Sequence, residues 1–268
     1  MHKIFSVIST SDRYEQLCNL IASINKHYSD KGWSIHGVLQ GYSDPQIETL
    51  KYLCTINNDW KNFDSRLGMF NSRQESMKII SKRYVGDEYT IVCLDDDIEF
   101  CAETNFETAI EYAQQSHVGL VSTNWISSEK LLYKKMPQEK YIKQAIVYTG
   151  GGLIIKSEIV EMIVKLEGGN FYSDNVETSV RVYVAGYENY RYLGSISIHR
   201  ACRSGGRKAW VNEGEQKKFS DSRLIDTRRC KNYNKPSITN DAEIHIGDST
   251  DLTLLAKKLH IQNNRLKK

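Results

Sequence analysis

The chain has 268 residues, of which 26% are charged and 40% are hydrophobic. This composition is typical of a globular protein of one large domain or two small ones, and it excludes a disordered or fibrous chain. The formal net charge is +3. No uncharged apolar run approaches the roughly 18 residues that a membrane span requires.

Strands and helices are expected to alternate along the first 199 residues. The expected strands are 3–9, 34–39, 89–94, 118–122, 145–148 and 190–199, and the expected helices are 14–27, 45–53, 69–80, 106–115, 157–166 and 175–185. The helices are recognised by apolar residues at helical spacing, and strand 89–94 is apolar at nearly every position, as a central parallel strand would be. The alternation predicts an α/β fold with a Rossmann-like, mainly parallel sheet flanked by helices. Ligands of such a fold bind at the carboxyl ends of the strands.

Neither a signal peptide nor a disulfide framework is evident. The apolar run at residues 4–8 is followed at once by Ser9, Thr10 and Asp12, so it is too short for a signal peptide and is typical of a first strand. The six cysteines, at positions 18, 54, 93, 101, 202 and 230, show no Cys-x-x-Cys spacing. We therefore expect reduced thiols in a cytoplasmic protein.

Three aspartates, Asp95, Asp96 and Asp97, directly follow strand 89–94. Adjacent carboxylates at the end of a buried strand repel one another unless a cation or several donors meet them. Hard divalent cations such as Mg²⁺ and Mn²⁺ favour oxygen ligands and are often shared with a substrate phosphate. Alternate residues of an extended segment point the same way, so Asp95 and Asp97 can face one ligand. An acidic turn that merely ends a strand is the structural alternative.

At this point the residues resemble a family, the nucleotide-sugar glycosyltransferases of the GT-A fold. The layout is closest to family 2 and to the polypeptide N-acetylgalactosaminyltransferases. The segment FSVISTSDR is similar to the opening strand and turn, GVLQGYSD to the second strand and turn, and RLGMFNSRQES to the NxGxxxARNxG segment. The resemblance implies nucleotide-sugar contacts from the residues at these positions and from the aspartates. They are Ser9, Thr10, Arg13, Gln40, Arg66, Arg73, Asp95 and Asp96.

Two of these segments depart from the family pattern. Gln40 and Gly41 stand where the family has acids that meet the nucleotide base, and Arg66 stands where it has Asn. Arg73 falls on the family's arginine, and its planar fork suits a diphosphate or a brace for the aspartates. The resemblance also implies that Asp95 and Asp97 form the DxD metal motif, with His199 at a strand end as a third ligand of Mn²⁺ or Mg²⁺.

The second half of the chain continues the resemblance. TGGGLIIKSEIVEMI is similar to the family's Gly-rich acceptor strand and the helix after it, and SDNVETSVRVYVAGYE is similar to the ED-x-[DE]-x-S-x-R and ENxExSxR segments. Asp174 is then the expected catalytic base if the reaction inverts the anomeric centre, with Glu177 in reserve. An N-terminal capping box is the alternative for this pair. Expected acceptor contacts are Trp125, Gly150, Gly151 and Gly152.

A basic segment follows the resemblance. Residues 200–235 hold eleven Lys and Arg against four acids, a net +7, whereas residues 1–199 carry 20 bases and 25 acids. We expect this segment to bind something anionic. A solvated basic face is the alternative. The acceptor candidates within it are Arg203, Arg207, Lys208 and Trp210.

The expected domains are a GT-A catalytic domain at 1–200, and a basic lid with a C-terminal helical extension at 201–268. The first domain has a nucleotide-sugar half at about 1–100 and an acceptor half at about 101–200. The resemblance implies a metal-dependent transfer from a nucleoside diphosphate sugar, with UDP-sugar favoured. The acceptor hydroxyl would belong to a saccharide or to a hydroxymethylated base of DNA, as in some phages. The alternatives are a metal-dependent nucleotidyltransferase and a non-catalytic binder of sugar nucleotides.

Overall fold

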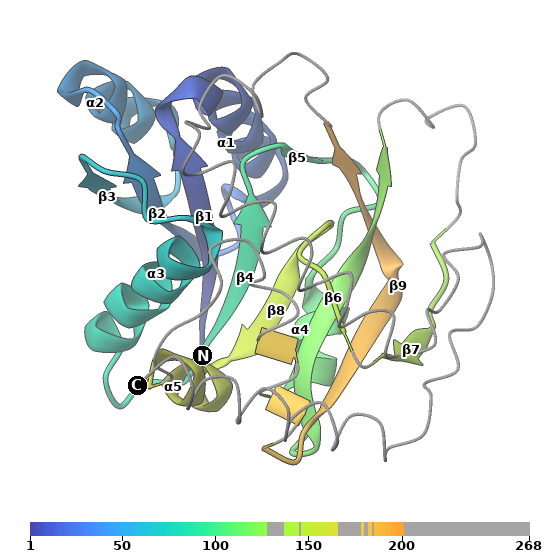
Figure 1. The fold of residues 1–268 in the computed structure, drawn as a ribbon. Coiled ribbons are helices and arrows are strands. Elements are labelled where there is room, and N and C mark those ends of the chain that lie inside the picture. The colour runs from blue at the N-terminus through green and yellow to red at the C-terminus, as the bar shows by residue number, and fades with distance from the viewer. Residues whose placement is uncertain (128–136, 145, 166–177, 180–181, 184, 201–268) are drawn as a thin grey trace, which may run out of the picture.

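The computed structural model describes residues 1–127, 137–144, 146–165, 178–179, 182–183 and 185–200 (Figure 1). The helical elements are η1 (Ser11–Arg13), α1 (Tyr14–Tyr28), α2 (Asp44–Leu53), α3 (Met69–Arg83), α4 (Glu107–Ala113) and α5 (Ser157–Val164). The strands are β1 (His2–Thr10), β2 (Trp33–Gln40), β3 (Asn57–Phe63), β4 (Tyr89–Asp95), β5 (Ile98–Phe100), β6 (Val118–Ser127), β7 (Tyr141–Lys143), β8 (Leu153–Lys156) and β9 (Glu188–His199).

The strands form one sheet in the order β3-β2-β1-β4-β8-β6-β9-β5, with β7 paired to β9. In the first half, β1 pairs in parallel with β2 and β4, and β2 with β3. The carboxyl ends of these strands therefore meet at one edge of the sheet. In the second half the sheet is mixed, because β8 runs antiparallel to both β4 and β6, and β9 runs parallel to β6.

Helices cover both faces of the sheet (Figure 1). Side chains of α1, α2 and α4 share one buried cluster with Phe5 and Val7 of β1. Side chains of α3 and α5 share a second cluster with Ile4 of the same strand. Because successive side chains of a strand point to opposite faces, β1 supplies both cores. The expected α/β fold, with helices flanking the sheet, is confirmed.

The expected elements are largely present, with one wrong strand and three omissions. Residues 146–148 are not a strand, because the chain turns at 150–151 and strand pairing begins only after this turn, in β8. The sequence did not predict β3, whose polar residues suit its place at the edge of the sheet, nor β5 and β7, which have three residues each. In the expected helix 175–185, described residues 178–179 and 182–183 are helical. The segment 201–268 lies outside the described residues.

No helix in the described ranges is long and apolar enough to span a membrane. The cysteines within those ranges, at positions 18, 54, 93 and 101, are free thiols.

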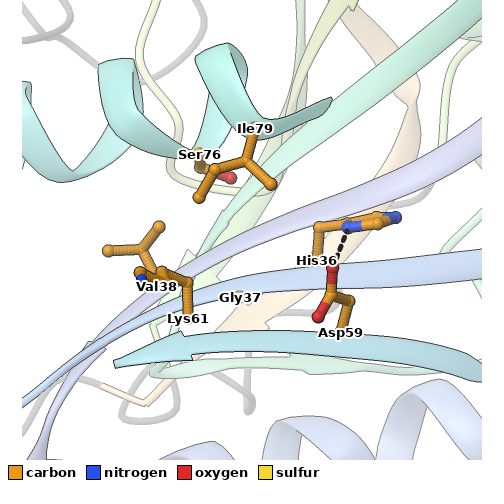
Figure 2. A pocket seen from close by; sticks show the side chains of 7 residues that line it. All are labelled: His36, Gly37, Val38, Asp59, Lys61, Ser76 and Ile79. Atoms are coloured by element: carbon orange, nitrogen blue, oxygen red, sulfur yellow. Dashed lines mark ion pairs between the residues drawn. The ribbon is translucent and has the colours of Figure 1, made fainter. Parts of the chain in front are cut away.

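A buried histidine lies between the sheet and α3. Figure 2 shows His36 of β2 facing Asp59 of β3, with Nδ1 3.7 Å from Oδ2, beside a pocket also lined by Ser76 and Ile79 of α3. The pocket has a volume of about 10 Å³, which is room for a single water. Burial, together with a smaller effect of the nearby Arg83, lowers the pKa of His36 to about 4, against the opposing effect of Asp59.

We predict that the protein loses stability as the pH falls from 6.5 to 4. In this window the unfolded chain protonates His36, whereas the folded chain keeps the buried ring neutral, so the free energy of unfolding falls by about 3 kcal/mol at pH 4. The measurement is urea unfolding across this window for the wild type and His36→Gln. The wild type should lose about that much more than the variant. The matched control is His2→Gln at the surface, and equal pH slopes for wild type and His36→Gln would contradict the prediction.

Candidate active site

The three aspartates lie where β4 ends, next to the ends of β1 and β2. Asp95 is the last residue of β4, Asp96 and Asp97 form a turn, and β5 starts at Ile98. Asp96 is 5% exposed. The carboxylates are therefore crowded into a largely buried turn, and the fold must supply the groups that offset their repulsion.

Arg13 offsets two of the three carboxylates. It ends η1, the short turn after β1, and Ile8 of β1 lies opposite Asp95 in the sheet. One terminal nitrogen of its guanidinium lies 2.7 Å from Asp96 Oδ1 and 2.7 Å from Asp97 Oδ2. Burial by itself lowers the pKa of Arg13, but the charges of Asp96 and Asp97 outweigh burial and raise the pKa above its ordinary value. Arg13 therefore holds a full positive charge at the site.

Arg73 offsets the third carboxylate. It lies in the second turn of α3, is 4% exposed, and forms an ion pair with Asp95 Oδ1. The hydroxyl of Thr149 donates to Asp95 Oδ2 at 3.2 Å. The guanidinium also donates to Thr149 Oγ1 at 3.4 Å. Both oxygens of Asp95 are therefore held by protein donors. The sequence pointed to Arg73 but missed Thr149, whose only signal is its place directly before the glycine run.

Asp96 is held by Ser9, which in turn is held by Tyr42. The Ser9 hydroxyl donates to Asp96 Oδ2 at 2.7 Å, so its oxygen accepts from the Tyr42 hydroxyl, also at 2.7 Å. Burial raises the pKa of Asp96 to about 7, with Asp97 and Asp95 adding to the rise and Arg13 and Ser9 opposing it. Both oxygens of Asp96 are therefore bound by side chains of the protein, Oδ1 by Arg13 and Oδ2 by Ser9. Tyr42 was not predicted, because its hydrogen bond joins the segment after β2 to Ser9 of β1.

Asp97 has one oxygen without a hydrogen bond. Within the described ranges, the buried Oδ1 of Asp97 accepts none, and it faces His199 Nε2 at 3.4 Å. The strand pairing creates this contact, because β5 runs antiparallel to β9 with Ile98 opposite His199. The Arg200 N–H also donates to the Asp97 carbonyl at 2.8 Å, which fixes the turn.

The donor set of Asp97 and His199 fits a divalent cation that is shared with a substrate. Among the described residues, no group of three His, Cys, Asp or Glu side chains is arranged as a complete ligand set. Mg²⁺ and similar ions are commonly held by one or two protein ligands together with substrate phosphates. Oδ1 of Asp97, which has no hydrogen bond to the described residues, and the adjacent imidazole nitrogen of His199 supply two such ligands.

The other expected nucleotide residues lie at the same strand ends. Gln40, at the end of β2, is 6% exposed and accepts the Leu67 N–H at 2.7 Å through Oε1. Arg66 lies 3.2 Å from Asp12 of η1. Thr10 ends β1 and lies opposite Gln40 in the sheet. Gln40 thus ties β2 to the segment that leads into α3.

The glycines are packed against the protein itself. A Cβ on Gly150 would lie 2.1 Å from Trp125 Cδ1, and one on Gly151 would lie 2.2 Å from the Asn124 carbonyl oxygen. Gly152 has φ +139 and packs against Phe106. The absence of a side chain at Gly150 lets the Trp125 indole lie on the backbone. The indole is 41% exposed, and its ring centre lies 5.1 Å from that of His199.

Several expected site residues lie outside the described residues. They are the catalytic candidates Asp174 and Glu177 and the acceptor candidates Arg203, Arg207, Lys208 and Trp210.

No protein-family model and no curated protein matches the chain. Solved structures do. The mannosyltransferase PcManGT of Pyrobaculum calidifontis, in complex with GDP-Man and Mn²⁺, matches with a TM-score of 0.57 and 14% identity over 83% of this chain and 64% of that one. GalNAc-T7 with UDP, GalNAc and Mn²⁺ gives a TM-score of 0.58 and 12% identity over 76% and 45%. TarS 1–349 of S. aureus gives 0.56 and 11% over 86% and 66%.

These neighbours show that the chain has the GT-A fold of glycosyltransferases, as the motifs implied. The chain spans less than two thirds of the length of each of the three.

We predict that Arg73 and Asp95 are strongly coupled in stability. Arg73→Met leaves the Asp95 carboxylate without its ion pair and should lower the free energy of unfolding by about 3 kcal/mol. The double variant Arg73→Met/Asp95→Asn should lose clearly less than the sum of the two single losses. Urea unfolding of the four proteins measures this. The exposed pair Lys51 and Glu48 on α2 is the control, with an expected coupling of about 0.5 kcal/mol or less. Additive losses at Arg73 and Asp95 would contradict the prediction.

Proposed function

We propose that the protein is a metal-dependent glycosyltransferase that moves a sugar from a nucleoside diphosphate sugar to a hydroxyl group. The observation that carries the proposal is the buried Oδ1 of Asp97, which has no hydrogen bond to the described residues and faces His199 at the carboxyl end of β4. Arg13 and Arg73 are bound to the neighbouring carboxylates. The GT-A fold and the neighbours solved with Mn²⁺ support it.

The residues of this chain have different roles at the proposed site for the nucleoside diphosphate sugar. Asp97 and His199 would hold Mn²⁺ or Mg²⁺, which when bound neutralises charge on the departing diphosphate. Arg73 is braced by Asp95 and Thr149, so it adds a fixed positive charge at the site. Pre-organised charges of this kind stabilise a developing anion without reorganising during the reaction. Ser9, Thr10, Gln40 and Arg66 lie at the strand ends where a nucleotide would bind.

One feature supports an acceptor site beside His199. The exposed Trp125 indole is held against Gly150 beside His199, where it offers an apolar face. Asp174 is our proposed base for the acceptor hydroxyl in an inverting reaction, with Glu177 as the second choice. In a retaining reaction these acids would position donor and acceptor instead.

Two alternative functions use the same residues. A nucleotidyltransferase would bind the same cation but release pyrophosphate, whereas a glycosyltransferase releases a nucleoside diphosphate. A non-catalytic relative would bind metal and donor, as measured by calorimetry, without turnover on any acceptor.

We predict that Asp97→Ala removes metal-dependent activity. Loss of this carboxylate should lower hydrolysis of a panel of nucleoside diphosphate sugars in Mn²⁺ by about 100-fold or more, because charge on the leaving diphosphate is no longer neutralised. Product nucleotide release measures turnover, and calorimetry measures Mn²⁺ binding. Asp87→Ala is the control, since Asp87 is an exposed acid just before β4, at the end of that strand opposite to Asp97. Undiminished turnover in Asp97→Ala would remove the metal-site assignment.

For the acceptor we propose a saccharide. The positive charge of the basic segment supports a hydroxymethylated DNA base as the second candidate. Residues 200–235 carry a net +7 and interleave Lys and Arg with Trp210, Phe219 and Tyr233. Basic side chains bind phosphates without regard to sequence, and aromatic rings stack on unpaired bases. The same charge also suits a donor diphosphate or an anionic glycan.

A salt series decides between the acceptors. If DNA is the acceptor, binding to duplex and single-stranded DNA should weaken steeply with salt, with a slope of about −0.7 to −0.9 per phosphate neutralised. The slope should flatten when five basic residues are changed to Gln: Arg203, Arg207, Lys208, Arg228 and Arg229. The matched control changes five exposed lysines of the first half to Gln: Lys26, Lys31, Lys51, Lys61 and Lys82. Weak binding at low salt, or equal slopes in both variants, would end the DNA hypothesis.

A further inference from the structure

Arg13 and the proposed metal ligand share one carboxylate. Asp97 accepts from the Arg13 guanidinium through Oδ2 at 2.7 Å, and its other oxygen, Oδ1, faces His199. The same guanidinium nitrogen also bonds Asp96. A cation bound at Oδ1 would therefore lie within a few ångströms of a permanent positive charge.

This closeness has an electrostatic consequence. The side chains of Asp96 and Asp97 are 6% and 10% exposed, and that of Arg13 is 22% exposed. Water screens charges poorly at such burial, so a divalent cation at Oδ1 is repelled by Arg13 more strongly than at a surface. Arg13 also withdraws part of the negative charge that would attract the cation. Both effects weaken cation binding by the side chains alone.

One N–H group of the Arg13 guanidinium donates no hydrogen bond to the described residues. The Nε of Arg13 is buried and has no hydrogen-bond partner within the described part of the chain. A buried donor without a partner is costly, so an acceptor that reaches it gains a favourable contact. A diphosphate would supply both an acceptor oxygen for this N–H and negative charge between the guanidinium and the cation.

We propose that Arg13 makes cation binding depend on the donor: it weakens the cation at Asp97 and His199 when no diphosphate is present, and it pairs with the diphosphate when donor and cation bind together. This inference rests on the proposed function. It assigns Arg13 as a positioning residue that couples the two binding events, and the coupling is reciprocal because cation and donor each raise the affinity of the other.

Calorimetry of Mn²⁺ binding tests the inference without any activity assay. Arg13→Gln removes the charge and should bind Mn²⁺ alone about tenfold more tightly than the wild type, or more. Saturating UDP or GDP should raise the Mn²⁺ affinity of the wild type much more than that of Arg13→Gln. Arg13→Lys keeps the charge and should remain close to the wild type. Arg83→Gln is the matched control, because it removes one positive charge at the end of α3 in an exposed ion pair with Asp59.

Each outcome decides the question. Unchanged or weaker Mn²⁺ binding by Arg13→Gln overturns the proposal, and so does equal tightening in Arg13→Lys or in Arg83→Gln. If Arg13→Gln does not fold, the wild type alone decides: Mn²⁺ affinity that neither UDP nor GDP raises overturns the coupling. Asp97→Ala separates the two levels. If it still binds Mn²⁺, the proposed metal site fails. If it does not, and Arg13→Gln behaves like the wild type, only the role of Arg13 fails.

Discussion

The repulsion among three consecutive carboxylates at the end of β4 is the constraint on which the site depends. A buried strand that ends in Asp95, Asp96 and Asp97 is stable only if positive charge and hydrogen-bond donors surround them. The fold provides these from three directions: Arg13 after β1, Arg73 from α3, and Ser9 and Thr149 from neighbouring segments. Of the six carboxylate oxygens, one has no hydrogen bond to the described residues, Oδ1 of Asp97. The residues that stabilise the turn therefore also select the oxygen that is left for a ligand.

The topology of the sheet explains why the surrounding groups come from distant parts of the sequence. Parallel pairing of β1, β2 and β4 places the segments after these strands at one edge. The change to mixed pairing at β8 then brings in Thr149 just before that strand, and β9 brings in His199. The parallel half supplies the arginine and hydroxyl contacts to Asp96, whereas the mixed half supplies the imidazole. The chemistry of the site thus lies at the junction of two sheet arrangements.

Local patterns predicted most of the fold and part of the site. Helical spacing predicted the helices and apolar runs predicted the central strands, because each pattern lies within one short segment of the sequence. The aspartates stood out for the same reason, and Arg13 and Arg73 stood out through their motifs. The partners were harder: Tyr42 and Thr149 act only through contacts between elements, and no local pattern marks them. The polar edge strand β3 and the three-residue strands β5 and β7 carry too little periodicity to be recognised.

The same distinction applies to Asp96 and to the glycines at 150–152. Sequence placed Asp96 with the donor contacts, but the structure encloses it between Arg13 and Ser9. The glycine run was expected to leave room for an acceptor, but its close neighbours are Trp125, Asn124 and Phe106. In both cases, the sequence shows the residue type, but it does not show which side chains fill the space beside that residue. The space beside a residue is determined by tertiary packing, which a single sequence does not display.

The position of β9 has a consequence for the order in which the protein assembles. Among the described strands β9 is the last along the chain, yet it lies between β6 and β5, so it must insert between strands that were synthesised before it. Until it does, β6 has an unpaired edge, and such edges are templates for pairing with other chains. Contacts between residues far apart in sequence also form slowly, because a long loop must close first. A chain that folds before β9 has paired therefore has an exposed edge at β6 and no imidazole beside Asp97, and the pairing of β9 removes both conditions at once.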